Sequence, residues 1–291
     1  MQNIFIEKIK ILLNHEHPFK LLLGGLLRRS RLSILFTIDC GYYKIKFYPT
    51  TGSVTLYATP NFKEDDNDFF IHYLKKGDTV IDIGANIGTE ALLSASLVKG
   101  DGKVYTFEPN PRIYKYLLNN IKLNGFHNIE PFCTAIGNEN SIVESTDLRN
   151  EDMNYIVADK SKNIRTIKTK LSRLEDLIPS TIQRINLLKI DAEGYELFVL
   201  KGAGNILDKT DCIYYESYEQ LYNKFTYTTK DVLFLLKGQS FKIFKIVGKE
   251  DIREIKNVDN YISSKFENLV AVQDVDAFVT RTGYKVETKE S

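Results

Sequence analysis

Short apolar runs alternate with segments of helical periodicity through the middle of the chain. Five runs have the length and composition of buried strands, and they cover residues 79–83, 103–107, 129–136, 185–190 and 212–215. Helical patterns begin near Asn86, Asn110 and Gly194, between successive runs. Strands that alternate with helices in this way are typical of a parallel sheet with crossover helices. The pattern therefore predicts an α/β fold.

The N-terminal part of the chain carries other patterns. Residues 4–13 have the spacing of an amphipathic helix. Apolar residues alternate over 35–57 around Thr51-Gly52, which predicts strands joined by a tight turn. Acidic residues at 64–68 precede an apolar segment that ends near residue 74, and this pattern predicts a helix.

Beyond the five runs, the pattern predicts a helix at 232–237, strands at 241–247 and 268–272, and hence a late antiparallel hairpin. The residues after Asp274 predict an edge strand or a partly ordered end. We therefore expect an N-terminal extension of helix and β-hairpin (1–60), one main domain (61–275) and a C-terminal tail (276–291).

A polar stretch at 141–171 lies within the main domain. It is weakly periodic and long for a connection in a compact domain. Long loops of this kind tend to be lids or binding loops, so we expect this one to cover a site and to help select a ligand.

Composition narrows the range of partners. The 39 Lys and Arg residues balance 38 Asp and Glu residues, so the net charge of +1 gives no field that would attract nucleic acid. The three cysteines, Cys40, Cys133 and Cys212, are far apart, which argues against a disulfide framework or a zinc site. We expect each to be a buried thiol in a reducing cytoplasm.

No segment has the roughly 20 uncharged apolar residues that a membrane-spanning helix needs. The charged residues at 7–10 stand where a signal peptide would be apolar, so secretion is not predicted. One apolar run, at 19–36, is interrupted by Arg28, Arg29 and Arg31, which is also the pattern of a segment on a membrane surface. Such runs more often pack in a core, so we expect this one to pack on the edge of the domain.

The stretch at 79–90 is the most informative part of the sequence. A buried strand contains Asp82 near its end, and Gly84 and Gly88 flank a turn that leads into a helix. Glycine allows the backbone to approach a ligand closely, and the helix directs its first amides toward the strand ends. The spacing of the two glycines differs from the GxGxxG pattern of enzymes that bind a dinucleotide pyrophosphate. The turn therefore favours a nucleoside without phosphates.

The next strand is followed by a carboxylate. Glu108 comes directly after the run at 103–107, so we expect it at the carboxyl end of a neighbouring strand, where it can accept both hydrogen bonds of a ribose diol. Asn110 and Pro111 follow, and they are at least as well suited to begin a helix as to contact a ligand. Asn124-Gly125 is suited to end that helix.

Four motifs carry a resemblance to a known family. Val80-Ile-Asp-Ile-Gly-Ala-Asn-Ile-Gly, Phe107-Glu-Pro-Asn-Pro, Ala135-Ile-Gly and Leu188-Lys-Ile-Asp-Ala-Glu-Gly-Tyr-Glu-Leu resemble, in this order, motifs of FkbM-family methyltransferases. The resemblance spans residues 65–272. It implies a Rossmann-like fold with a mainly parallel seven-stranded sheet, helices on both faces, S-adenosylmethionine as the cofactor, and methylation that commonly targets hydroxyl groups.

The resemblance also assigns cofactor contacts to individual positions. Glu108 would hold the ribose, and Ala135 with Ile136 would lie near the adenine. The first motif would cradle the methionine part of the cofactor, and its residues are Asp82, Gly84, Asn86 and Gly88.

Two carboxylates follow the fourth run. Asp191 and Glu193 alternate, so both are expected to point toward the cleft. A hydroxyl loses its proton as it attacks a methyl group, so either carboxylate could act as a base or orient the acceptor. Alternatively, Asp191 binds the cofactor's ammonium group and Glu193 caps the next helix. Both could ligate Mg²⁺, but the nearby sequence offers no third ligand, and we expect no metal site.

Glu216 ends the fifth run and either faces the same pocket or is a surface acid, so the candidate catalytic set is Asp191, Glu193 and Glu216. The tyrosines around it could form a stacking platform for a sugar or belong to the core, and they are Tyr214, Tyr215, Tyr218, Tyr222 and Tyr227.

We therefore expect a cytoplasmic, S-adenosylmethionine-dependent O-methyltransferase that acts on a glycan or a small-molecule hydroxyl. One rival interpretation is an inactive cofactor-binding protein in polysaccharide assembly. The other is an NAD-dependent oxidoreductase, which the spacing of Gly84 and Gly88 disfavours.

Overall fold

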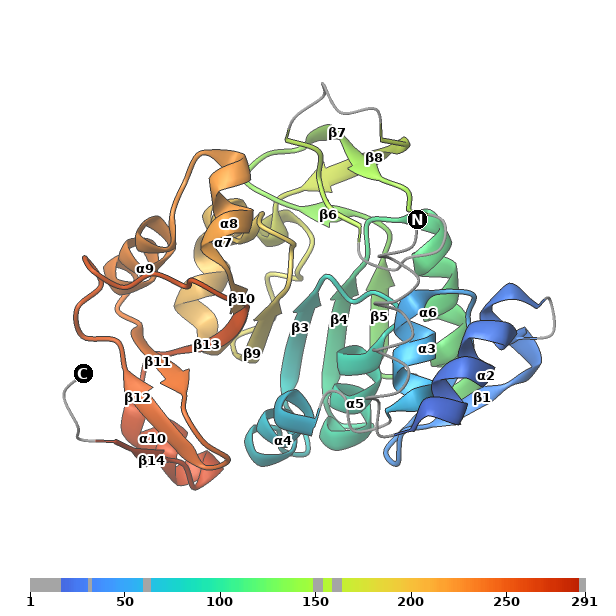
Figure 1. The fold of residues 1–291 in the computed structure, drawn as a ribbon. Coiled ribbons are helices and arrows are strands. Elements are labelled where there is room, and N and C mark those ends of the chain that lie inside the picture. Colours follow the sequence, from blue (N-terminus) through green and yellow to red (C-terminus); the bar gives the residue numbers. More distant parts are fainter. Residues whose placement is uncertain (1–16, 31–32, 60–63, 149–153, 159–163, 288–291) are drawn as a thin grey trace.

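A computed structural model describes residues 17–30, 33–59, 64–148, 154–158 and 164–287. Within them, the main sheet has nine strands in the order β14-β12-β11-β13-β10-β9-β3-β4-β5 (Figure 1). Five neighbouring strands are parallel, namely β10 (Thr210–Ser217), β9 (Ile185–Ile190), β3 (Thr79–Ile83), β4 (Lys103–Phe107) and β5 (Ile129–Phe132). The strands beyond β10 are β13 (Glu267–Val272), β11 (Lys242–Ile246), β12 (Asp251–Glu254) and β14 (Lys285–Val286).

The Rossmann-like α/β fold is thus confirmed, and three of the five predicted strands have the predicted bounds. The sheet has two more strands than expected, because β12 and β14 extend it beyond the antiparallel pair β11 and β13. The helix expected at residues 4–13 lies outside the described residues.

Helices cover both faces of the sheet because successive side chains of each strand point to opposite sides. Val80 faces one hydrophobic cluster, which includes side chains of α4 (Glu64–Tyr73), α5 (Thr89–Val98) and α10 (Val275–Thr282). Ile81 faces the other cluster, with α7 (Glu196–Ala203) and α9 (Thr229–Gly238). The remaining helices of the domain are α6 (Pro111–Asn124), α8 (Glu219–Tyr222) and the 3₁₀ turns η2 (Leu174–Asp176), η3 (Gly204–Lys209) and η4 (Asn223–Phe225).

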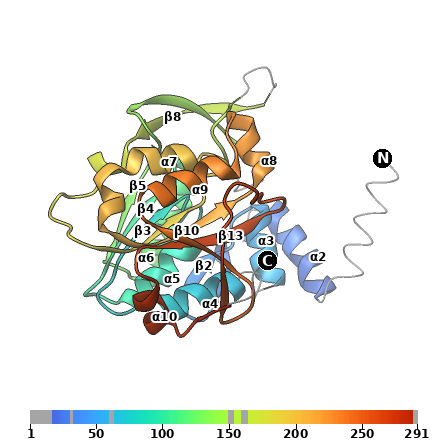
Figure 2. The same ribbon diagram turned by 90° about the vertical axis from the view of Figure 1, so that its left-hand side faces the viewer.

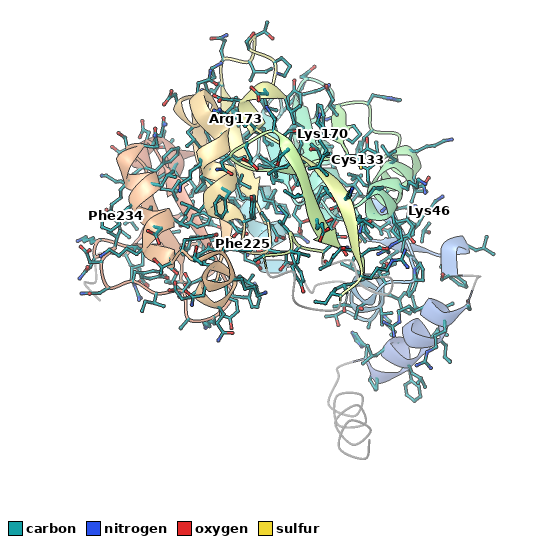
Figure 3. The ribbon with its side chains drawn as sticks, turned by 90° about the horizontal axis from the view of Figure 1, so that it is seen from above. Lys46, Cys133, Lys170, Arg173, Phe225 and Phe234 are labelled. Atoms are coloured by element: carbon teal, nitrogen blue, oxygen red, sulfur yellow. The ribbon has the colours of Figure 1, made fainter. Side chains whose placement is uncertain are left out.

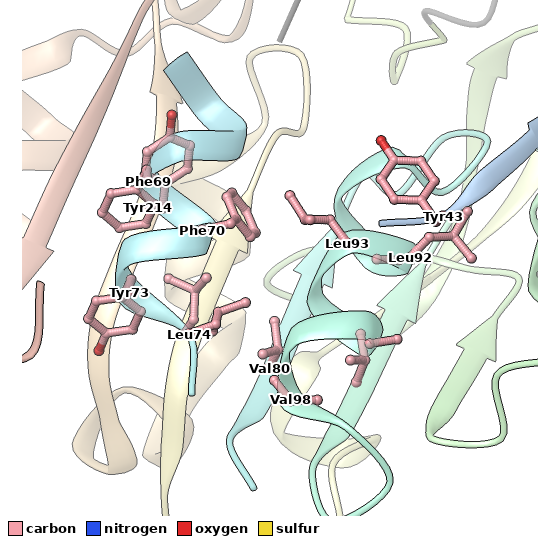
Figure 4. Packing of buried hydrophobic residues seen from close by; sticks show 14 of the residues in the cluster. Tyr43, Phe69, Phe70, Tyr73, Leu74, Val80, Leu92, Leu93, Val98 and Tyr214 are labelled. Carbon is pink, nitrogen blue, oxygen red and sulfur yellow. The ribbon is translucent and has the colours of Figure 1, made fainter. Parts of the chain in front are cut away.

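Aromatic stacking fixes α4 on the sheet. The rings of Phe69 and Tyr214 are stacked with their centroids 4.4 Å apart, and Figure 4 shows them side by side between helix and strand. Asp66 accepts a hydrogen bond from the hydroxyl of the same tyrosine. The first turn of α4 is thereby held over β10, beside the carboxyl ends of the parallel strands.

The N-terminal part forms a layer outside α6. It contains α2 (Pro18–Arg29), η1 (Ser33–Leu35), a hairpin of β1 (Thr37–Asp39) and β2 (Lys44–Lys46), and α3 (Thr51–Ala58). The prediction of strands up to residue 57 is wrong for its last part, where α3 stands in place of a tight turn and a second strand. Thr50 accepts a hydrogen bond from the Ser53 amide and so caps this helix. None of the helices in the described part of the chain is long and apolar enough to cross a membrane.

A second sheet contains β6 (Ala135–Ile136), β8 (Thr166–Ser172) and β7 (Ser141–Thr146). The single strand predicted at 129–136 is therefore two, since Ala135 pairs with Leu171 of β8. The polar stretch at 141–171 contains strands where a loop was expected. In the view from above, β8 crosses the molecule beside the labelled Lys170 and Arg173 (Figure 3).

The end of the chain is also more regular than expected. The residues after Asp274 form α10, whose Phe278 is buried in the core, and then β14, which is an edge strand as predicted.

Candidate active site

The turn after β3 brings two strand ends into direct backbone contact. Gly84 has a φ of +80°, and a Cβ on it would lie 1.8 Å from the Asp191 carbonyl oxygen. Its amide and that of Ala85 donate to the Phe107 carbonyl at the end of β4, both at 3.0 Å. Only glycine fits this position, because any side chain would collide with the backbone after β9.

Glu108 lies beside this turn with both carboxylate oxygens oriented by backbone amides. Oε2 accepts from the Asn86 amide at 3.0 Å, and Oε1 accepts from the Asn110 amide at 2.8 Å. Burial raises the pKa of Glu108 to about 7, while the two amides act to lower it. Each oxygen keeps a lone pair that can accept a further hydrogen bond.

A buried lysine, which the sequence analysis did not single out, lies under the site. The Nζ atom of Lys189 lies 3.3 Å from Asp82 Oδ1 and 3.5 Å from Asp191 Oδ2, and it donates to the Gly84 carbonyl at 3.3 Å. Burial acts to lower the pKa of Lys189, but the nearby carboxylates outweigh it and the pKa lies above its usual value. The lysine therefore fixes Asp191 while Asp82, which is fully buried, acts as its counter-ion.

Three carboxylates surround the end of β9 and β10. Burial, and after it the charge of Asp191, raises the pKa of Glu193 to about 8. Burial, and after it the charges of Asp191 and Glu193, raises the pKa of Glu216 to about 9. Among the described residues, neither glutamate side chain accepts a hydrogen bond. These two carboxyl groups can therefore gain and lose protons at about pH 8 to 9, far above the range of an ordinary carboxylate.

The helix-capping role considered for Glu193 belongs to another residue. Glu196 Oε1 accepts from the amides of Ala192 and Gly194 at 2.9 and 3.2 Å. The Tyr227 hydroxyl donates to the Gly194 carbonyl at 2.7 Å, so the turn is closed from both sides. Glu193 itself has a φ of +53°, which holds its backbone in the left-handed region.

Two cavities meet at Asp191. The first is lined by the β3 turn, by Glu108, by the end of β6 and by part of the predicted lid; its lining includes Gly84, Asn86, Ala135, Ile136, Asn154, Tyr155, Ile156, Asp191 and Glu193. The second, of about 210 Å³, lies between α4 and the strand ends; its polar lining includes Asp66, Glu90, Lys189, Asp191, Glu216 and Asn268.

The structure thus brings together most of the expected site residues but not all. Gly88 begins α5 beneath the site, where a Cβ would lie 2.6 Å from Leu117 Cδ1. Asn110 accepts a hydrogen bond from the Arg112 amide and so caps α6, which was one of its two predicted roles. Neither residue lines the two cavities, and neither does Asp82.

Of the two interpretations of the five tyrosines, a place in the core is confirmed for four. Their side chains are buried in the core, and they are Tyr214, Tyr215, Tyr222 and Tyr227. Tyr214 nevertheless contributes to the wall of the second cavity. In the part of the chain that the structure describes, no three His, Cys, Asp or Glu residues are grouped so that they could hold a metal ion.

The known proteins to which the chain is similar include methyltransferases. A hexuronic acid methyltransferase, AglP of Haloferax volcanii, is 26% identical over 145 residues, which are 49% of this chain and 56% of AglP. The chain spans about half the length of the curated relatives it matches.

Among solved structures, a methyltransferase FkbM from Methylobacillus flagellatus is 15% identical, with a TM-score of 0.43 over 86% of this chain and 57% of that chain. Fibrillarin from Aeropyrum pernix, solved with bound S-adenosyl-L-methionine, is 14% identical, with a TM-score of 0.42 over 72% of this chain and 74% of that chain.

The family model described as the methyltransferase FkbM domain matches residues 82–243, which are more than half of the 291 residues. The match includes the β3 turn, Glu108 and all three carboxylates at the ends of β9 and β10. The chain therefore belongs to the FkbM methyltransferase family.

Proposed function

We propose that the protein transfers a methyl group from S-adenosylmethionine to a hydroxyl group of a carbohydrate or a related polyhydroxylated molecule. The observation that carries the proposal is the position of Asp191, which lines both cavities. A donor in the first cavity and an acceptor in the second would meet at this residue.

The residues of the first cavity fit the cofactor. The free lone pairs of Glu108 suit the two hydroxyls of its ribose, and Ala135 with Ile136 offers an apolar wall for the adenine. Gly84 and Asp191 also line this cavity, and the Asp191 carboxylate suits the cationic ammonium group of the cofactor. When bound, the cofactor supplies a methyl group on a sulfonium, and the protein must align the acceptor with it and exclude water.

Two carboxylates beside Asp191, one in each cavity, can accept the proton of the acceptor hydroxyl. The acceptor hydroxyl must lose its proton as its oxygen takes the methyl group. Glu216 lines the cavity on the acceptor side, and Glu193 lines the adjoining cofactor cavity. With pKa values of about 9 and 8, either group binds a proton more tightly than an ordinary carboxylate does. We assign the role of base to this pair and the orientation of the acceptor to Asp191.

The polar lining of the second cavity supports a polyhydroxylated acceptor. Most of its polar groups are carboxylates, which accept hydrogen bonds and suit a ligand rich in hydroxyl donors. The relative from Haloferax volcanii is named for a hexuronic acid, which is a carbohydrate. We therefore assign this chain a carbohydrate acceptor.

The test combines cofactor binding with methyl transfer. Calorimetric titration with S-adenosylmethionine is expected to show one site, and NAD is expected not to bind. The purified protein is then incubated with methyl-labelled cofactor and a panel of mono- and oligosaccharides, and the product is analysed for a methyl ether. Label on an amine or a ring carbon would contradict O-methylation, and lack of cofactor binding would contradict the whole proposal.

A further inference from the structure

Helix α2 exposes large apolar side chains on the outside of the molecule. Phe19, Leu22, Leu23 and Leu26 are 85%, 52%, 46% and 58% exposed. Their spacing of three and four residues places them on one face of the helix. Figure 2 shows α2 at the edge of the molecule, outside α3. An exposed apolar face of this kind marks a contact site.

The opposite face of α2 packs against α3 and the hydrophobic core. Gly24 is buried, and a Cβ on it would lie 3.1 Å from Val54 Cγ1 and 3.4 Å from Tyr57 Cδ1 on α3. Leu21 and Leu27 lie against the hydrophobic core. The expected packing on the domain edge is thus present, but it uses the inner face only. The outer apolar residues are not needed to hold the helix in place.

Charge identifies the partner of the outer face. Helix α2 carries Lys20, Arg28 and Arg29 but no acidic residue. In the sequence, the nearest acids are Glu16 and Asp39. Apolar residues flanked by cations, without acids, are typical of helices that lie in the headgroup region of an anionic membrane. A second copy of the chain would bring the same cations against each other, which disfavours self-association through this face.

The exposed apolar surface continues beyond the helix. Leu35 and Phe36 are 75% and 47% exposed, and they precede β1. We propose that α2, together with these two residues, binds the surface of an anionic phospholipid bilayer. Phe19, Leu22 and Leu26 would enter the headgroup region while the lysine and arginines contact the phosphates.

The test measures sedimentation of the full chain with vesicles. Vesicles of phosphatidylcholine mixed with phosphatidylglycerol are expected to bind the protein, and vesicles of phosphatidylcholine alone to bind it weakly. The double substitution Leu22→Ser/Leu26→Ser should lower partitioning about 10-fold or more, because it removes two inserted side chains. Lys20→Gln/Arg29→Gln should lower it about 5-fold per charge and remove most of the salt dependence.

A matched control removes exposed apolar residues elsewhere. Ile142 on β7 and Phe234 on α9 are 65% and 46% exposed, and Figure 3 labels the latter. The double substitution Ile142→Ser/Phe234→Ser should leave vesicle binding unchanged. Melting temperatures of all variants show whether they are folded, and the readout does not depend on methyl transfer.

Two outcomes would overturn the proposal. One is equal vesicle binding by the wild type and the folded α2 variants. The other is a dimer in solution that the Leu22→Ser/Leu26→Ser variant converts to a monomer, with no binding of the wild type to anionic vesicles. That result would assign the face to contact between copies.

Discussion

Glu108 lies on the cofactor side of this site, and Glu193 and Glu216 lie beside Asp191, where the two cavities meet. All three carboxylates share a sheet edge and are largely buried, yet their surroundings differ. Glu108 has a backbone amide on each oxygen. Glu193 and Glu216 accept no hydrogen bond from the described residues and lie close to Asp191. The two amides favour the ionised form of Glu108 and orient it as an acceptor, whereas no hydrogen-bond donor in the described part of the chain opposes the higher pKa values of Glu193 and Glu216. We infer that the local partners, more than the residue type, separate a binding role from a catalytic one.

Substitution of Gly84 should have the largest effect, because it displaces the backbone where the ends of β3 and β9 meet. Gly84→Ala would place a methyl group 1.8 Å from the Asp191 carbonyl oxygen at a φ of +80°. We expect cofactor affinity to fall at least ~100-fold and stability to fall by about 3 kcal/mol or more. Calorimetric titration and thermal unfolding measure the two effects.

The matched control for this substitution is Gly125→Ala. Gly125 also has a positive φ, of +65°, but a Cβ there would meet nothing within 4 Å. It should lose only about 1 kcal/mol and keep its cofactor affinity. If both variants behaved alike, the strand-end contact would have no special role.

Removing either ionisable carboxyl group beside Asp191 should slow the reaction. Glu216→Gln and Glu193→Gln are each expected to lower kcat by about 10²- to 10⁴-fold, while the cofactor Kd changes less than about 3-fold. Glu130→Gln, at a strand end away from the cavities, serves as the control. A normal kcat in both site variants would remove the pair from the mechanism.

The pH dependence of the wild type follows from the same pair. A base must be ionised to accept a proton, so kcat should rise as the pH passes through about 8 to 9, the pKa values of the pair, and level off only above them. The rise should be absent from the residual activity of the double variant Glu193→Gln/Glu216→Gln. A flat profile in the wild type would show that proton removal does not limit the reaction.

On the donor side, Glu108→Gln should weaken binding more than it slows the reaction. The amide group can accept on one side only, so the Asn86 or Asn110 amide loses its partner and one ribose contact is lost. We expect the cofactor Kd to rise about 10- to 100-fold, with kcat at saturating cofactor within about 5-fold. The opposite split, with an unchanged Kd and a low kcat, would reverse the roles assigned to the two sides.

The smallest effect concerns stability. In the unfolded chain Glu216 has its ordinary pKa of 4.5, whereas the folded value is about 9. Between these values the folded state holds more protons, so the free energy of unfolding falls as the pH rises. Glu216→Gln should remove this loss and be more stable than the wild type by about 1–3 kcal/mol at pH 9, with little difference at pH 4. Thermal unfolding at both pH values tests it.

The part of the site that could be predicted from sequence is the part encoded by short-range rules. A strand, a glycine turn and a helix start lie within residues 79–90, and the strand bounds, Gly84 and Glu108 were predicted as they occur. Lys189 was missed although it stands two residues before Asp191, on the same side of the strand. A lysine in an apolar run was the available signal, since burying it requires partners.

Other errors came from long-range contacts. The pairing of β8 with β6 and β7 joins segments far apart in a polar stretch, where period and composition indicated a loop. Residues 54–57 are apolar enough for a strand, but the Thr50 cap and burial against α2 favour a helix. The sequence does not show which apolar residues of α2 pack against α3, so its exposed apolar face could be identified only from the structure.

The backbone of Glu193 has a consequence for how the protein can be improved in the laboratory. A residue held at a φ of +53° would relax on replacement by glycine or asparagine, and the replacement would also remove a partly buried acid. Selection for heat resistance alone should therefore enrich such variants at position 193. Heat-resistant descendants would then have to be screened for turnover as well, because selection for rigidity and selection for turnover favour different residues at this position.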